Sequence, residues 1–200
     1  GIKARQLKVP DAALHALING YTMESGVRGL KKRLDTLCRY AAVKLVKGEQ
    51  KSITVTVKKL PEFLDRRPIH HEHILEAIKP GVVTGLAWTS AGGEILFIET
   101  MQTKGSGKVQ ITGQLGDVMK ESAEIAVSLV KSLYPKETAD WEKYDLHIHV
   151  PEGAVPKDGP SAGITLTTAL ASLVTGKAVS PEYAMTGEVS LRGCVMPIGG

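Results

Sequence analysis

Apolar residues recur at helical spacing twice in the first quarter of the chain, and this pattern predicts two helices. The first covers residues 11–18, where Asp11 can cap the start and Asn19-Gly20 signals the end. The second covers residues 25–46 and carries charged residues on its opposite face. Its inward positions are Val27, Leu30, Leu34, Leu37, Ala41 and Leu45.

A strand and a short helix are predicted next. Residues 51–57 alternate between Ile53, Val55 and Val57 on one face and threonines on the other, which is typical of a half-buried strand. Residues 60–64 favour one further helical turn. The first part of the chain is therefore predicted to be a small helical module with one strand.

From Gly81 onward the pattern changes to short strands that alternate with two longer helices. Strands are expected over 82–89, 94–100, 109–112, 146–150, 184–186 and 189–191. One helix is expected over 114–133, and a second follows Pro160 and ends near Gly176. The inward face of the 114–133 helix is predicted to hold Leu115, Val118, Met119, Ser122, Ala126, Leu129 and Leu133. The fold class is α+β, a helical module followed by an α/β domain.

Lys104–Lys108 is a glycine-rich segment between two predicted strands. Its Gly107-Lys108 pair is similar to the end of a phosphate-binding loop. However, Gln102 stands where the first glycine of that motif belongs, and no helix follows. We therefore predict a β-hairpin tip here rather than a nucleotide site.

Charge and composition place a domain boundary between the two parts. Residues 1–80 carry 16 Lys and Arg against 8 Asp and Glu, whereas residues 81–200 carry 9 against 13. We expect domains over 1–68 and 81–200, joined by a linker over 69–80 that proline and glycine bracket. The basic half could contact nucleic acid or an acidic partner, although a solvated helix surface accounts for the same charges.

Several protein classes are disfavoured by composition. The chain has no apolar run of 18 residues and no signal pattern, so a soluble, cytoplasmic protein without a membrane partner is expected. Cys38 and Cys194 lie far apart in sequence and are expected to be free thiols. His70, His71 and His73 have no second ligand cluster near them in sequence, so we predict no metal site.

A turn followed by a helix surrounds Ser161 and is the most informative chemical feature of the chain. Gly159 accepts a positive φ and Pro160 suits a first helical turn, so Ser161 is expected at a helix N-terminus. Free backbone N–H groups there can stabilise an oxyanion, which makes Ser161 a candidate nucleophile. The position also suits an ordinary N-cap serine, and the local pattern does not separate these two interpretations.

A serine nucleophile needs a base within hydrogen-bond reach. His147 and His149 are expected to share one face of a strand, and either could act with Asp158 or Asp145 as the residue that orients it. The histidines could equally line the site or bond to the backbone. The residues alone leave the identity of the base open.

Several segments, in order, resemble the Lon family of ATP-dependent proteases. The match to the catalytic segment includes Ser161, and the first match resembles the small helical lid of the family's ATPase module. The matching segments are Tyr21–Leu30, Gly85–Thr89, Gly116–Ser122, His147–Gly163, Met185–Gly193 and Pro197–Gly200. Together they are far more specific than a single short motif.

The resemblance implies a role for each matching residue. Ser161 would be the acyl-forming nucleophile, Thr186 the hydroxyl that contacts a catalytic lysine, and Asp158 the acidic residue beside the nucleophile. His149 and Glu99 match positions near the site. A bare threonine such as Thr186 could also simply stabilise a tight turn.

The family's base is a lysine that forms a dyad with the serine and follows the Pro-Ile-Gly-Gly element by a few residues. Burial must lower the pKa of such a lysine before it can act. The only lysine after Ser161 is Lys177, which does not match that position. We therefore expect the protease domain over 81–200 to be truncated at its C-terminus and the fragment alone to be inactive.

The resemblance implies an ATP-dependent serine endopeptidase that degrades unfolded, damaged or short-lived proteins as a homohexameric ring. ATP with magnesium would serve the complete enzyme, and Arg28 matches the lid arginine that senses nucleotide phosphate. No cofactor is expected on this chain alone, because the ATPase core is absent from it. The alternative is a non-catalytic module used for assembly or weak DNA binding, which steeply salt-dependent binding would identify.

Overall fold

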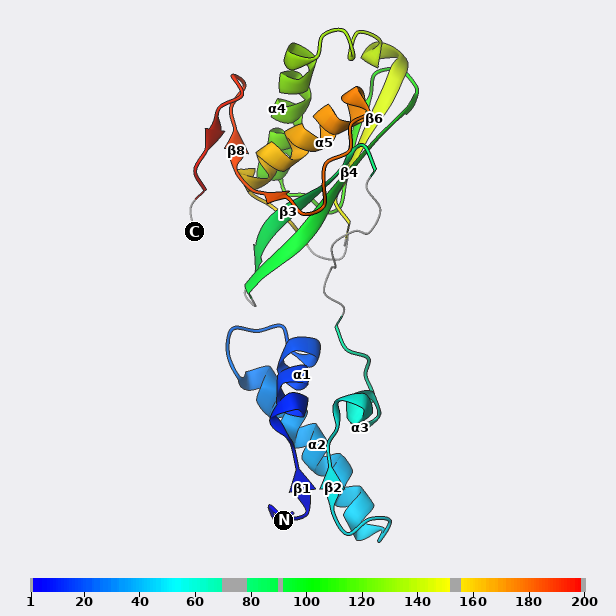
Figure 1. Cartoon of the computed structure of the whole chain (residues 1–200), viewed down its shortest axis with the longest axis vertical. Coiled ribbons are helices and arrows are strands. Elements are labelled where there is room, and N and C mark those ends of the chain that lie inside the picture. Colours follow the sequence, from blue (N-terminus) through cyan, green and yellow to red (C-terminus); the bar gives the residue numbers. More distant parts are fainter. Residues whose placement is uncertain (1, 70–78, 90–91, 152–155, 199–200) are drawn as a thin grey trace. The chain divides into compact units, whose positions relative to one another are not determined.

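The computed structural model describes residues 2–69, 79–89, 92–151 and 156–198. The chain divides into two compact units, one formed mainly by its N-terminal third and the other by the remainder (Figure 1). Helices and strands occur together, which confirms the predicted α+β class. Most of the expected linker over 69–80 lies outside the described residues, as do His70, His71 and His73.

The N-terminal unit is built from three helices and one pair of short strands. In chain order they are β1 (Leu7–Lys8), α1 (Asp11–Tyr21), α2 (Arg28–Val46), β2 (Ile53–Thr54) and α3 (Leu60–Leu64). The parallel pair of β1 and β2 holds the start of the chain against the segment that follows α2. The unit has a core of its own, which includes Leu17, Tyr21, Leu37, Ala41, Ile53, Val55, Leu60 and Phe63.

The structure differs from the sequence predictions at four places in this unit. Helix α2 begins at Arg28 rather than at residue 25, so Val27, which was predicted to face inward, precedes the helix and is 71% exposed. Helix α1 continues through Asn19-Gly20 to Tyr21, because the Tyr21 ring is buried in the core and holds the last turn in place. The strand predicted over 51–57 is reduced to β2, since Val57 is 49% exposed and begins a 3₁₀ turn. Strand β1 was not predicted, because two residues are too few to display an alternating pattern.

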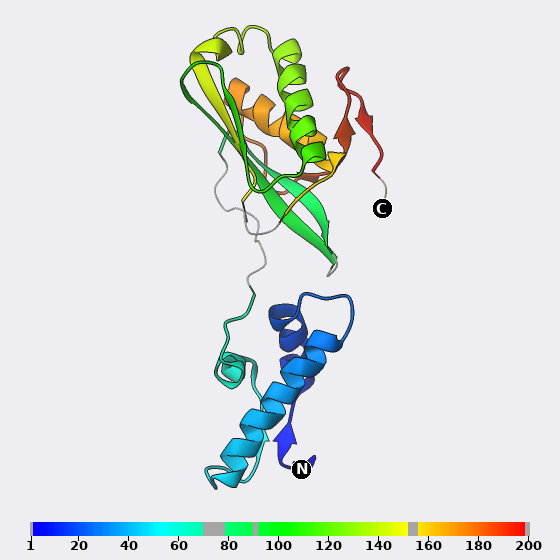
Figure 2. The same ribbon diagram turned by 180° about the vertical axis from the view of Figure 1, so that it is seen from behind.

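The C-terminal unit is organised around a five-stranded sheet with strand order β5-β6-β4-β3-β7. Its strands are β3 (Val82–Thr89), β4 (Gly92–Lys104), β5 (Val109–Thr112), β6 (Tyr144–His149) and β7 (Ala184–Met185). Helices α4 (Asp117–Leu133) and α5 (Gly163–Thr175) lie beside each other on one side of this sheet (Figures 1 and 2). A small hairpin of β8 (Glu188–Val189) and β9 (Val195–Met196) packs against both helices.

The predicted hairpin at Lys104–Lys108 is wrong, because β4 and β5 are not neighbours. Strand β6 lies between them, antiparallel to β4 and parallel to β5. Asp145 on β6 organises the connection by accepting the N–H groups of Ser106 and Lys108 at 2.8 and 3.0 Å. These two donors hold the pKa of the Asp145 carboxyl below its usual value.

Helix α4 begins at Asp117 rather than at Gln114, whose φ of 54° is left-handed. Its buried face is also turned from the predicted one, since Val118 is 43% and Leu133 57% exposed. Ala123, Val127 and Val130 are buried instead, whereas Met119, Ser122, Ala126 and Leu129 are buried as predicted. The residues buried along α4 are Met119, Ser122, Ala123, Ala126, Val127, Leu129 and Val130.

In the described part of the chain, no helix is both long enough and apolar enough to cross a lipid bilayer.

Candidate active site

A cavity of about 740 Å³ in the C-terminal unit contains the Ser161 side chain in its wall. Its lining residues are mostly apolar, and those with polar side-chain groups include Ser161, Thr186 and Glu94. The lining residues are Leu86, Ala87, Trp88, Gly93, Glu94, Ile95, Ser161, Thr186 and Ile198. Residues of β3 and β4 thus bring an apolar surface next to the predicted nucleophile.

The backbone around Ser161 is held from the side of Thr186 and Gly187. Ser161 lies in a 3₁₀ turn over Pro160–Ala162, and α5 begins just after it. Its carbonyl oxygen accepts the Gly187 N–H at 2.7 Å and the Thr186 hydroxyl at 3.3 Å. The N–H of Ile164 donates to the Gly187 carbonyl at 2.9 Å. These contacts fix Ser161 and Thr186 as neighbours, although they lie far apart in sequence.

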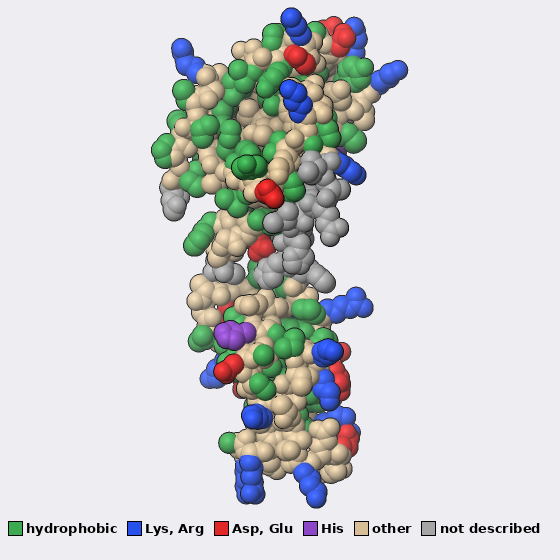
Figure 3. Space-filling view, viewed as in Figure 1, with side chains coloured by type: hydrophobic (Ala, Val, Ile, Leu, Met, Phe, Trp, Pro, Cys, Tyr) green, Lys and Arg blue, Asp and Glu red, His purple; other side chains and the backbone are tan. Residues whose placement is uncertain are grey.

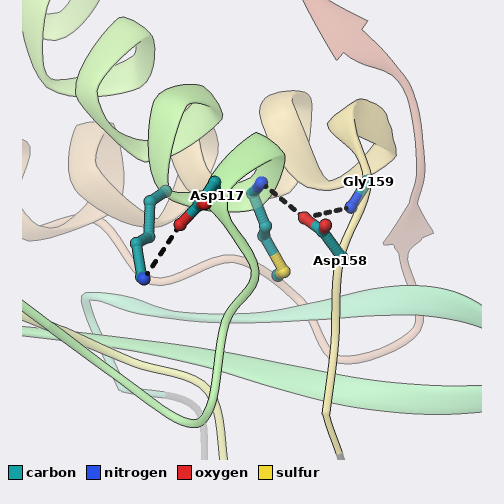
Figure 4. A network of polar contacts seen from close by, with 5 residues as sticks. Asp117, Asp158 and Gly159 are labelled. Carbon is teal, nitrogen blue, oxygen red and sulfur yellow. Dashed lines mark hydrogen bonds and ion pairs between the residues drawn. The ribbon is translucent and has the colours of Figure 1, made fainter.

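Asp158 contacts the start of helix α4 (Figure 4). Its Oδ1 accepts the N–H of Met119, the third residue of α4, at 3.0 Å, and the N–H of Gly159 at 2.8 Å. The N-cap residue of α4, Gly116, has no side chain to perform this function. Asp158 therefore supplies the N-cap of α4 from a distant segment, an interaction that contributes about 0.5–2 kcal/mol in helices.

A short backbone pairing adds to this contact. Leu115 and Lys157 form a parallel β-bridge, in which the Gly116 N–H donates to the Lys157 carbonyl at 2.7 Å. The Lys157 N–H donates in turn to the Gln114 carbonyl at 3.1 Å. The segment that leads to Ser161 is therefore attached to the segment that leads into α4.

His147 and His149 share one face of β6, as the alternation predicts. Thr112 Oγ1 on β5 lies 2.9 Å from His147 Nε2 and 2.7 Å from His149 Nδ1. Glu99 on β4 is directly opposite His149 in the strand register. A cluster of polar side chains thus lies across three strands.

The structure does not assemble a serine–histidine–aspartate triad from these residues. Neither His147 nor His149 lines the cavity at Ser161. The carboxylate of Asp158 accepts the N–H groups of Met119 in α4 and of Gly159, and that of Asp145 accepts backbone N–H groups after β4. The histidine interpretation that the sequence left open is not supported by this geometry.

Trp88 and Glu94 line the cavity but were not given a role from the sequence. The sequence feature that could have pointed to Trp88 was a large aromatic residue on a predicted strand that also carries apolar residues. Trp88 is 88% exposed in the structure, which is unusual for a large aromatic ring. Hydrophobic side chains gather on the face of this unit shown in Figure 3, whereas Lys and Arg stand mostly at its edges.

Arg28 is the first residue of α2 and is exposed to solvent. The start of this helix is capped by Glu24, whose carboxylate accepts the N–H groups of Gly29 and Leu30 at 2.7 and 2.9 Å. These two donors hold the pKa of the Glu24 carboxyl below its usual value. The turn that presents Arg28 is therefore ordered by an adjacent carboxylate.

Among the described residues, no three His, Cys, Asp or Glu side chains are grouped so that they could hold a metal ion. Cys38 and Cys194 are both free and exposed, as predicted.

Comparison with known proteins matches both parts of the chain. Residues 54–200 match the family described as the Lon protease (S16) C-terminal proteolytic domain, and residues 1–53 match the Lon protease AAA+ ATPase lid domain. Over its whole length the chain is 54% identical to the Lon protease of Clostridium beijerinckii and 53% identical to that of Methanosarcina barkeri. It is 52% identical to Lon protease 1 of Bacillus subtilis. These findings confirm the family resemblance, and the chain spans 25–26% of the length of these three relatives.

Proposed function

The chain belongs to the Lon protease family, and on this basis we propose that it is the lid and protease part of a serine endopeptidase in which Ser161 is the nucleophile. The observation that carries the proposal is the position of Ser161. Its side chain lines an apolar cavity beside Thr186, and its backbone is held by two hydrogen bonds to its carbonyl oxygen. A fixed nucleophile next to an apolar surface suits attack on an extended, unfolded polypeptide.

In the proposed reaction, Ser161 Oγ attacks the carbonyl carbon of a peptide bond and forms an acyl-enzyme, which water then hydrolyses. The base is a lysine that the 200 residues do not include at the position given by the family pattern. Thr186, whose hydroxyl faces the Ser161 turn, is proposed to contact that lysine. Apolar walls formed by Leu86 and Ile95 would favour the neutral amine that a base requires.

The proposal extends to the whole protein. It would use ATP with magnesium, assemble as a homohexamer in the cytoplasm, and degrade unfolded or damaged proteins. Arg28 is proposed to contact nucleotide phosphate, since it is exposed at the start of α2 and an arginine offers a fixed fork of donors. Roles for His149 and Glu99 near the reaction remain part of this proposal.

The experiment is hydrolysis of peptides and of an unfolded protein by a version extended to the length of its relatives. Ser161→Ala should abolish hydrolysis, with a loss of about 10³-fold or more. The matched control is Ser128→Ala, which removes an exposed serine hydroxyl on α4. Full activity in the Ser161→Ala protein would overturn the proposal. An inert extended protein that binds DNA in a steeply salt-dependent way would support the non-catalytic alternative.

A further inference from the structure

Asp158 is placed by family resemblance beside the nucleophile, yet its carboxylate bonds to the N–H groups of Met119 and Gly159. Both partners are neutral backbone donors. Gly159 has φ 115° and ψ 159°, a conformation that side-chain-bearing residues rarely adopt. A single oxygen of Asp158 therefore joins the start of α4 to a conformationally unusual residue two positions before Ser161.

Gly116 explains how this carboxylate reaches the helix. A Cβ added to Gly116 would overlap the Asp158 carboxyl group, so the carboxylate occupies the space of the missing side chain. The neighbouring acidic residue Asp117 shows the contrast, because its exposed carboxylate pairs with Lys120 one turn along the same helix (Figure 4). Of these two acidic residues, Asp158 is the one that connects different segments.

We propose that Asp158 is a positioning residue for Ser161, which fixes the turn of the nucleophile against the N-terminus of α4 and takes no part in proton transfer. The inference rests on the proposed function of Ser161. Different residues hold the backbone on the two sides of Ser161. Thr186 and Gly187 hold the carbonyl side of Ser161, and Asp158 holds the turn that precedes it. Because an amide oxygen accepts an N–H as a carboxylate oxygen does, the geometry requires an acceptor rather than a negative charge.

The kinetic test compares Asp158→Ala, Asp158→Asn and the control Asp117→Ala in the protein extended to the length of its relatives. Asp158→Ala should lower kcat about tenfold or more and change KM less than twofold, since misplacement of a reacting group is costly. Asp158→Asn should keep kcat within about threefold of the parent and leave the pH profile unshifted. An Asn variant as impaired as the Ala variant would assign the charge a chemical role and overturn the proposal.

A second measurement does not depend on hydrolysis. Amide hydrogen exchange in the 200-residue chain should accelerate about tenfold in Asp158→Ala, both at Met119 and over residues 159–164, but not in Asp117→Ala. Unchanged exchange over 159–164 would overturn the positioning role whatever the kinetics show. If the extended parent does not hydrolyse peptides, the proposed function fails, and the exchange result still decides the role of Asp158.

Discussion

Helices α2 and α4 both have backbone N–H groups in their first turns that need an acceptor, and each receives it from a different place in the chain. Neither has an N-cap side chain that bonds to the helix, since the N-cap residues are Val27 and Gly116. In α2 the acceptor is Glu24, five and six residues before its two donors. In α4 the acceptor is Asp158, 39 residues from its donor. The first cap orders only its own turn, whereas the second joins a helix to the turn of the proposed nucleophile.

A glycine lies beside each capping carboxylate. The distance from an added Cβ on that glycine to the carboxyl atoms shows how closely the two pack. A Cβ on Gly29 would lie 3.0 to 3.1 Å from the Glu24 carboxyl atoms, which end a flexible side chain that can move. A Cβ on Gly116 would overlap the Asp158 carboxyl group, whose short side chain is held by two hydrogen bonds to its Oδ1. The distant cap therefore tolerates far less change than the local one.

The largest effect is expected for Gly116→Ala. The new methyl group must displace Asp158, so the loss of unfolding free energy should reach about 2–3 kcal/mol through lost capping and overpacking. Urea denaturation of the chain measures it. Combined with Asp158→Ala, the substitution should cost less than the sum of the two single changes, because the group it overlaps is gone. Additive free energies would show that the two residues are not in contact.

Asp158→Ala by itself should lower the unfolding free energy by about 1 kcal/mol, the usual value of an N-cap. Asp158→Asn should recover most of that loss, because asparagine is an equally good capping residue. Thermal unfolding of the three proteins at neutral pH provides the comparison. Equal loss in both variants would contradict a capping role in which only the acceptor matters.

The local cap of α2 should appear as an acid-dependent stability. The pKa of Glu24 is lowered from 4.5, so its stabilising contribution is complete above that value and is lost as pH falls through the lower folded value. The protection factors of α2 amides, which compare the exchange rate with the intrinsic rate at the same pH, should therefore fall as pH is lowered from about 5 to about 3, and Glu24→Gln should weaken this dependence. The amides of α4 serve as the control, since Glu24 does not cap that helix.

The smallest effect is expected for Gly29→Ala. The flexible end of Glu24 can shift by a few tenths of an ångström, and alanine favours a helical position by about 1 kcal/mol over glycine. These effects oppose each other, so the change in unfolding free energy should stay within about 0.5 kcal/mol of zero. A destabilisation as large as that of Gly116→Ala would remove the difference between the two caps.

Much of the fold could be predicted because burial leaves a periodic record in the sequence. Strand β3 has the predicted bounds of Val82–Thr89, and the end of α5 near Gly176 is confirmed by its left-handed C-cap. The candidate site was only partly predictable. Ser161 was a candidate from the local turn-and-helix pattern as well as from the family motifs, and Thr186 from the motifs alone, but Trp88 and Glu94 were not given a role in the site. The residues that line a cavity come from several segments, so no repeating pattern of apolar residues within one segment identifies them.

The sequence by itself determined the class of most elements, the two-part organisation and the family, because each depends on patterns within short segments or on ordered motifs. The tertiary structure decided which segments meet. It placed β6 between β4 and β5, where the sequence predicted a hairpin. It also placed the Asp158 carboxylate in a hydrogen bond with the start of α4 rather than with a histidine. Backbone N–H groups form the decisive contacts here, and since every residue except proline carries one, only the folded chain reveals which of them an acceptor reaches.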